Sequence, residues 1–514
     1  MMTNSLTSQT FHGLKWSYIG TITYAILQIG FTAAFARLIG PHGYGLIAMA
    51  NVVIRFGSYF AEMGIGPALI QKMDLDEKDI ASASSFSILL GLFFFAVLWL
   101  LAPLLASFIF KSTEVIPIVR VSSISLVLNG FSVTSTSILR RNLRFREIAI
   151  IEVISFAIGS GVVGLYFAFH GYGAWSIVYA TLTQSTLLSL LSYMRVYHPL
   201  SLKMSFQKIG QLYSYGSKMS FISFSEFIAG QLDTMFIGHS LGPVNLGIYN
   251  RAYMLVYLPV YNINVSITRV LFPSFSRVQS EPVRLRNAYI SLVTIVSAIV
   301  IPICGIILIS AKEVIAVLLG AQFTEAVPIA QMLAIAIPIG SLHFGGPICD
   351  ALARLNQKLV VQLSYLCVLL ILFVMLGSYG LPGYALALLL GLSFRSIGYI
   401  YLLTTILQVD LTLYRNAYFS PLRTATIIVV TGYLADVCLQ SLSLPAGYLL
   451  ATKFALGTLI FLVFTFRFPN PHLRKEMMTV LTRLLSASIP ETFPFKYLRP
   501  YCTFLMSTAY KEHD

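Results

Sequence analysis

Charged residues are scarce in this sequence of 514 residues. Asp, Glu, Lys and Arg make up only 11% of the chain, whereas 57% of it is hydrophobic and the mean hydropathy is +0.80. Soluble domains carry about 25% charged residues, so this composition excludes a soluble globular protein and predicts a membrane protein. The net charge of +14 does not indicate nucleic-acid binding, because that activity needs a basic face on a soluble domain.

Cysteine clusters and catalytic motifs are also lacking. The five cysteines do not show metal-ligand or disulfide-framework spacing. The sequence has no phosphate-cradling Gly-Lys-Ser/Thr loop, no paired His and Glu at metal spacing, and no Ser-His-Asp set in one predicted compartment. We therefore predict no metal, no cofactor and no enzymatic activity. The N-terminus lacks a short apolar core before a small-residue cleavage site, so its first apolar run is expected to remain as a helix.

Long apolar runs fill most of the chain. A helix that crosses a bilayer needs about 20 apolar residues, and the sequence accommodates fourteen such spans, which predicts an all-α integral membrane protein. Lys and Arg concentrate in alternate loops, while the loops between contain only Lys111 and Lys312. Since positive residues favour the cytoplasmic side, both termini are expected in the cytoplasm.

The sequence contains a duplication. Gly40-Pro41, followed by Tyr44-Gly45-Leu46, recurs as Gly242-Pro243, followed by Leu246-Gly247-Ile248. A repeat at this spacing predicts two similar structural units, and in transporters with parallel repeats the substrate path lies between them. At both Gly-Pro pairs a tight helix turn is favoured, and a hinge is the alternative. The sequence predicts a six-helix lobe over 1–200 and a second six-helix lobe over 201–410. Two additional helices are predicted over 411–467, followed by a basic cytoplasmic tail over 468–514. Within the tail, 473–485 are predicted to form an amphipathic helix.

Polar residues follow helical spacing within several apolar runs. An ionisable residue in the bilayer core costs about 2.5–3.5 kcal/mol on insertion scales and commonly faces a cavity or a partner. Asn51, Arg55, Ser58 and Glu62 fall on one face of a helix. The preceding and later runs carry further polar positions: Gln28, Glu226, Asp233, Arg251, Arg269, Arg395 and Lys453.

Each of these positions has a second interpretation. Arg55, Glu226 and Arg395 lie near the predicted midplane, where they either line a water-filled path or form a structural pair such as Arg55 with Glu226. Arg251 and Arg269 lie nearer the span ends, where long side chains also reach the interface. Lys453 is expected to line a groove or meet a lipid headgroup.

Several blocks of the sequence resemble one family. They are Gly13-Leu14-Lys15-Trp16, Ala36-Arg37-Leu38-Ile39-Gly40-Pro41, Ala68-Leu69-Ile70-Gln71, Leu139-Arg140-Arg141-Asn142-Leu143-Arg144-Phe145, Leu232-Asp233-Thr234-Met235-Phe236-Ile237-Gly238, Leu246-Gly247-Ile248-Tyr249-Asn250-Arg251-Ala252-Tyr253 and Arg269-Val270-Leu271-Phe272-Pro273. In this order they resemble the polysaccharide exporter branch of the multidrug/oligosaccharidyl-lipid/polysaccharide flippase superfamily, in particular the O-antigen and colanic-acid exporters.

The resemblance implies a bacterial inner-membrane flippase that moves undecaprenyl-pyrophosphate-linked oligosaccharide units by alternating access. It implies that the substrate's pyrophosphate and sugars meet the candidates Arg55, Arg251, Arg269, Arg395, Asn51 and Gln28. It suggests Glu62, Glu226 and Asp233 for coupling to H⁺ or Na⁺. The implied partners are the lipid-linked oligosaccharide, membrane lipids and a polysaccharide polymerase.

Two other functions stay open from the sequence. A multidrug cation antiporter belongs to the same superfamily, although several arginines in the predicted path oppose a cationic substrate. A membrane-embedded glycan polymerase or ligase is the second alternative. The short outer loops count against it, because such enzymes usually need a sizeable loop to hold sugars.

Overall fold

The computed structural model of the chain describes residues 2–62, 65–71, 75–197, 217–277, 281–352, 354–439 and 444–467. These residues form helices, and no strand occurs among them. The all-α fold predicted from the sequence is therefore confirmed. The predicted amphipathic helix of the tail and the predicted boundary between the two lobes, at residues 200 and 201, lie outside the described residues.

The helices divide into two groups along the chain. The first group is α1 (Met2–Glu62), α2 (Ile65–Gln71), α3 (Glu77–Leu105), η1 (Ala106–Phe110), α4 (Val115–Ser122), α5 (Ile124–Arg141), α6 (Phe145–Phe156), η2 (Ala157–Gly164), α7 (Leu165–Phe169) and α8 (Ala174–Arg195). The second is α10 (Ser217–Ala229), α11 (Leu232–Arg277), α12 (Pro282–Leu318), η3 (Ala321–Phe323), α13 (Ala326–Ser341), α14 (Gly345–Ala351), α15 (Leu355–Leu376), η4 (Gly377–Tyr379), α16 (Gly380–Leu407), α17 (Leu411–Leu439) and α18 (Ala446–Arg467).

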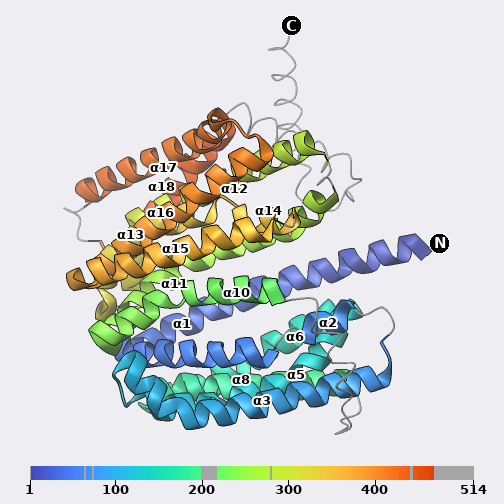
Figure 1. Cartoon of the computed structure of the whole chain (residues 1–514). Coiled ribbons are helices and arrows are strands. Elements are labelled where there is room, and N and C mark those ends of the chain that lie inside the picture. Colours follow the sequence, from blue (N-terminus) through green and yellow to red (C-terminus); the bar gives the residue numbers. More distant parts are fainter. Residues whose placement is uncertain are drawn as a thin grey trace, which may run out of the picture.

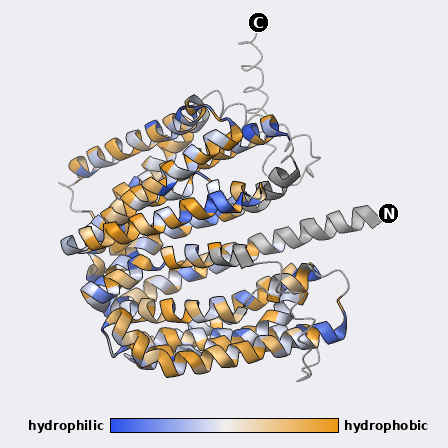
Figure 2. Cartoon of the chain, viewed as in Figure 1, coloured by the Kyte–Doolittle hydropathy of each residue, from blue (hydrophilic) through white to orange (hydrophobic). Residues whose placement is uncertain are grey.

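The helices carry apolar residues along most of their length (Figure 2). Among the described residues, nine helical segments are long and apolar enough to cross a membrane. Two of them, Ile19–Ala61 and Leu355–Leu407, contain glycines with positive φ, Gly40 and Gly380. The chain is a multi-pass membrane protein, and the number of fourteen crossings stays a prediction.

Both Gly-Pro pairs form sharp bends inside long helices. Gly40 has φ 71° and ψ 177°, and Gly242 has φ 78° and ψ −177°. Glycine adopts positive φ without the steric penalty of a Cβ atom, and proline fits the first turn of the helix that follows. The tight turn predicted at each Gly-Pro pair is thus observed, and it divides α1 and α11 into two halves each.

The two groups of helices meet along α1 and α11. In Figure 1, α2–α8 lie in the lower half of the molecule and α11–α18 in the upper half, with α1 and α10 between them. The closest approach is at the two bends. A methyl group at Gly45 would overlap the carbonyl of Pro243, and one at Gly247 would overlap the carbonyl of Pro41. We call this reciprocal contact the Gly-Pro crossing and the side of the protein that contains it the Gly-Pro end.

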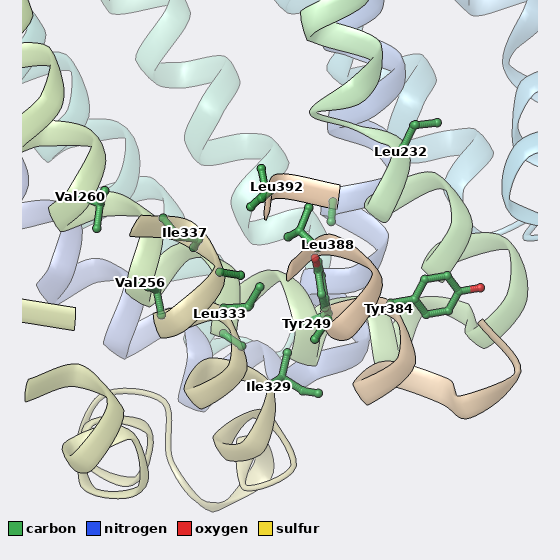
Figure 3. Packing of buried hydrophobic residues seen from close by; sticks show 14 of the residues in the cluster. Leu232, Tyr249, Val256, Val260, Ile329, Leu333, Ile337, Tyr384, Leu388 and Leu392 are labelled. Atoms are coloured by element: carbon green, nitrogen blue, oxygen red, sulfur yellow. The ribbon is translucent and has the colours of Figure 1, made fainter. Parts of the chain in front are cut away.

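One face of α11 packs into the second group. Figure 3 shows side chains of α11 in one buried cluster with residues of α13 and α16. They are Leu232, Tyr249, Val256 and Val260 on α11, Ile329, Leu333 and Ile337 on α13, and Tyr384, Leu388 and Leu392 on α16. This packing fixes the rotation of α11 and therefore which of its side chains face α1.

The last two helices pack on α12 through a buried charge cluster. Lys453 of α18 is 2.9 Å from Glu313 of α12 and 2.7 Å from Asp436 of α17, and its side chain is only 2% exposed. Its ammonium also donates to the carbonyl of Ile309, at 3.0 Å. The prediction that Lys453 lines a groove or meets a lipid headgroup is wrong, because two carboxylates from neighbouring helices neutralise it inside the protein.

Candidate functional site

Arg55 is a cation between the two groups of helices. It lies on the second half of α1, one turn after Asn51, and both side chains are exposed. The helix α11 packs against α1, and its Tyr257 lies close enough to Arg55 for an electrostatic interaction. Within the described ranges, Arg55 has no hydrogen bond or ion pair with another side chain. It is therefore available to an anionic ligand.

Four tyrosines form a ladder on the second half of α11. Tyr249, Tyr253, Tyr257 and Tyr261 follow one another at every fourth residue, which places them on one side of the helix. Successive ring centroids are 6.3, 5.1 and 5.3 Å apart, with interplanar angles of 23–25°. The ladder runs from Tyr249, which is 1% exposed, to Tyr261, which is 46% exposed. Sequence analysis missed this feature, although its regular spacing is visible in the chain.

Arg395 lies beside the buried part of the ladder. It is partly buried on α16, and its guanidinium lies 4.7 Å from the ring centroid of Tyr365 and donates to the carbonyl of Gly340 at 3.0 Å. Its charge acts on Tyr253. The structure thus places Arg55 and Arg395 near neighbouring rungs of the tyrosine ladder.

Arg251 occupies a different place. Its guanidinium lies 4.0 Å from the ring centroid of Tyr44 and donates to the side-chain oxygen of Asn250 at 2.7 Å. Because Tyr44 belongs to α1 and Arg251 to α11, this cation–π contact joins the two groups of helices near the Gly-Pro crossing. The geometry gives Arg251 a role in closing this end of the protein.

Glu226 forms an ion pair with Lys358. The Lys358 ammonium is 3.1 Å from Glu226 of α10 and 3.0 Å from Asp350 of α14. The Lys358 side chain is only 4% exposed, whereas that of Glu226 is 43% exposed. The structural pair of Arg55 with Glu226, which the sequence left open as one alternative, is therefore wrong. The partner is Lys358, because α15 begins at Leu355 and turns Lys358 into the protein between the two carboxylates.

Asp233 is buried and hydrogen-bonded. It accepts a hydrogen bond from the Tyr249 hydroxyl at 3.0 Å and one from the backbone N–H of Thr234 at 2.6 Å. It therefore anchors the buried end of the tyrosine ladder. Any role of Asp233 or Glu226 in ion coupling stays a proposal.

Of the other predicted site residues, Gln28 packs elsewhere. Gln28 is partly buried on the α1 face that also carries Tyr24 and Phe31, and those two rings pack against Phe156 of α6 at 4.3 and 5.6 Å. Glu62 and Arg269 lie on α1 and α11, and their side chains are outside what the structure describes.

Contacts across the Gly-Pro end close one side of the site. Tyr44 packs edge-on against Phe323 with ring centroids 6.3 Å apart, His239 lies 2.9 Å from the carbonyl of Ile109, and Arg37 donates to the carbonyl of Val317. All three contacts join the two groups of helices.

Towards the opposite end the groups are bridged by aromatic rings. Phe56 and Tyr59 of α1 approach Phe224 and Phe227 of α10 with ring centroids 5.8–6.4 Å apart.

A separate cavity lies within the second group of helices. It has a volume of about 520 Å³ and a mostly apolar lining from α12, α13, α16 and α17, including Ile335 and Leu422. No residue of α1 or α11 lines it, so it is not part of the polar site around Arg55.

Comparison with known proteins identifies the family. Residues 34–328 match the family described as polysaccharide biosynthesis protein, which is more than half of the chain. The chain belongs to the polysaccharide biosynthesis protein family. The matched range contains the Gly-Pro crossing, Arg55 and the complete tyrosine ladder.

Individual known proteins are similar to this chain over about two thirds of its length or more. The teichuronic acid biosynthesis protein TuaB of Bacillus subtilis is 26% identical, covering 89% of this chain and 95% of its own length. The lipopolysaccharide biosynthesis protein WzxC of Escherichia coli is 24% identical over 66% of this chain and 70% of its own length. An uncharacterised membrane protein in the cps region of Klebsiella pneumoniae is 23% identical over 94% of this chain and 100% of its own length.

Solved structures share the fold of this family member. The lipid II flippase MurJ in an inward closed conformation has a TM-score of 0.69 and 18% identity, and the match covers 87% of this chain and 97% of MurJ. An inward-facing multidrug resistance transporter of the MATE family has a TM-score of 0.57 and 16% identity, with 74% of this chain and 94% of that chain covered. At these identities the likeness establishes the fold alone.

Proposed function

We propose that this protein is a flippase that moves undecaprenyl-pyrophosphate-linked oligosaccharide units across the bacterial inner membrane for surface polysaccharide synthesis. The observation that carries the proposal is that Arg55, which lies between the two groups of helices near Tyr257, has no partner side chain among the described residues. A cation in an apolar protein is costly unless a partner compensates it. An anionic substrate supplies that partner.

The chemistry of arginine fits a pyrophosphate. Its guanidinium stays charged and presents planar donors that bind phosphate oxygens in pairs. Arg395, near the next rung of the ladder, supplies a second positive charge. Two cations at one site favour an anionic substrate and disfavour the cationic substrates of a multidrug antiporter. The names of the relatives, which refer to teichuronic acid and lipopolysaccharide biosynthesis, support a saccharide substrate.

The mechanism follows from the two halves of the fold. We place the substrate path between the repeated lobes, 1–200 and 201–410, with the pair of helices over 411–467 outside the repeat. In the state described, contacts at the Gly-Pro end separate the site from that side, which we assign to the periplasm. The substrate is loaded from the cytoplasmic side, where both termini lie, and its polyprenyl tail remains in lipid. Exchange between this state and one that opens at the Gly-Pro end moves the headgroup across.

This role is transport without covalent chemistry. The glycan polymerase that consumes the translocated unit is a separate partner in this scheme. Export is driven by consumption of the product or by a H⁺ or Na⁺ gradient, with Glu62, Glu226 and Asp233 as the coupling candidates.

A deletion and reconstitution experiment tests the proposal. Cells without this gene should lose the surface polysaccharide and accumulate the lipid-linked unit on the cytoplasmic leaflet, and the intact gene should restore export. In proteoliposomes, the purified protein should make the extracted lipid-linked unit accessible to a glycosidase added on the opposite side. A purified protein that polymerises the units itself, or deleted cells that keep normal surface polysaccharide, would contradict the proposal.

A further inference from the structure

The hydroxyls of the tyrosine ladder are available for binding. The Tyr249 hydroxyl is used by Asp233, which holds the first rung in place. The hydroxyls of Tyr253, Tyr257 and Tyr261 have no hydrogen-bond partner in the part of the chain that the structure describes. Polar groups on an apolar helix are normally satisfied by protein, water or ligand, so three successive phenols that the described protein does not use are available to water or to a ligand.

The later rungs of the ladder lie beside the other group of helices. The first rung, Tyr249, and the neighbouring apolar positions Val256 and Val260 belong to the buried cluster with α13 and α16 (Figure 3), so the Tyr249 end of the ladder is buried within its own group. Tyr257 instead lies within the electrostatic reach of Arg55 on α1. Exposure rises along the ladder towards Tyr261. The free hydroxyls therefore extend from the anion-binding residues towards the end away from the Gly-Pro crossing.

The chemistry of these rungs matches neutral sugars. Each phenol donates one hydrogen bond and accepts others without carrying charge, and its ring offers an apolar surface beside a polar tip. A sugar ring has the same character, with C–H faces and a rim of hydroxyls. The ring centroids of Tyr253, Tyr257 and Tyr261 follow one another at 5.1 and 5.3 Å. This spacing is about the length of one pyranose ring along a glycan, so consecutive sugars can contact consecutive tyrosines.

We propose that Tyr253, Tyr257 and Tyr261 form a glycan-binding ladder that holds the sugars of the lipid-linked oligosaccharide while Arg55 holds its pyrophosphate. This inference rests on the proposed function and assigns a second subsite to it. The rigid stack is held at its buried end by the Asp233 hydrogen bond, so little conformational freedom is lost when a sugar binds. Since the three rungs present the same groups, the ladder recognises neutral sugars without requiring one particular composition.

Two lipid probes separate the two subsites. The first is undecaprenyl pyrophosphate, which has no sugar, and the second is the lipid-linked oligosaccharide extracted from cells that lack this gene. We expect wild-type protein in nanodiscs to bind the second probe more tightly. Tyr257→Phe and Tyr261→Phe should each weaken binding of the second probe about threefold to tenfold, the effect of one neutral hydrogen bond. Binding of undecaprenyl pyrophosphate should not change.

Matched variants complete the test. The double variant Tyr257→Ala, Tyr261→Ala should lose the preference for the saccharide-bearing lipid. Arg55→Gln should instead weaken the binding of both probes. Tyr433→Phe, at an exposed tyrosine of α17, should leave the binding of both probes unchanged. The ladder would be refuted if the wild type bound the two probes with equal affinity. It would also be refuted if the phenylalanine variants kept the full preference, or if they weakened binding of both probes equally. Each of these results would leave the flippase proposal intact. If the wild type binds neither probe, the proposed function itself fails.

Discussion

Gly45 of α1 lies directly against the carbonyl of Pro243 on α11, and the copy of this pair, Gly247 against Pro41, is formed on the other side of the crossing. The sequence repeat therefore contacts itself. Only a residue without a side chain allows the two backbones to come this close. This contact closes the Gly-Pro end and sets the relative position of the two halves.

Alanine at either crossing glycine should disturb this closure. Gly45→Ala and Gly247→Ala each introduce a methyl group that overlaps a backbone carbonyl, and overpacking of this kind costs about 1–3 kcal/mol. We expect a lower melting temperature in detergent and reduced polysaccharide export. Gly30→Ala is the control, because no atom lies within 4 Å of the position its Cβ would take. Crossing variants as stable and active as Gly30→Ala would show that the two halves do not depend on this contact.

Arg55 should be needed for binding of the substrate rather than for folding. It is exposed and has no partner side chain among the described residues, so Arg55→Gln should leave the melting temperature unchanged. A hydrogen bond to a charged group contributes about 1.5–3 kcal/mol, so affinity for undecaprenyl pyrophosphate should fall at least tenfold. Arg55→Lys should bind with intermediate affinity, because lysine keeps the charge and loses the paired donors.

A matched arginine controls for charge in general. Arg284 at the start of α12 is exposed and paired with Glu281 at 3.0 Å, so Arg284→Gln should bind undecaprenyl pyrophosphate as the wild type does. Normal binding by Arg55→Gln would remove Arg55 from the substrate site.

Lys358 should stabilise the fold through its two carboxylate partners. Removing one member of a buried ion pair typically costs about 3–5 kcal/mol, because the remaining charge is left without compensation. Lys358→Met should therefore lower the melting temperature strongly. The triple variant Lys358→Met, Glu226→Gln, Asp350→Asn should recover most of the loss, since no charge is then unpaired. If the triple variant melts as low as Lys358→Met, the ion pairs do not explain the effect.

The same cluster bears on ion coupling. The Lys358 ammonium already lies 3.1 Å from Glu226, so a proton or Na⁺ that binds Glu226 has to compete with it. Glu226→Gln removes this competition and leaves Asp350 to neutralise Lys358. If Glu226 couples transport to an ion gradient, polysaccharide export by this variant should not change when the gradient is collapsed.

Local features were predictable from the sequence, and long-range partners were not. Gly40-Pro41 and its copy predicted tight turns because positive φ and a helix start depend on neighbouring residues alone. The spacing of Asn51 and Arg55 placed them on one helix face for the same reason. The partners of Glu226 and Lys453 come from helices distant in the chain, and no periodicity encodes such pairing.

The charge cluster around Lys453 should hold the last two helices, α17 and α18, on α12. Lys453 contacts one carboxylate on α12 and one on α17, and it is almost completely buried. Lys453→Met leaves the buried Glu313 unpaired, and we expect this loss to loosen α17 and α18 and to expose them to limited proteolysis. Combining Lys453→Met with Glu313→Gln and Asp436→Asn should restore protection, because a neutral cluster of similar volume removes the unpaired charge. Since our proposal places α17 and α18 outside the repeated lobes, affinity for undecaprenyl pyrophosphate should be equal in the triple variant and the wild type. A triple variant that stays folded and loses this affinity would assign the two helices to the substrate site.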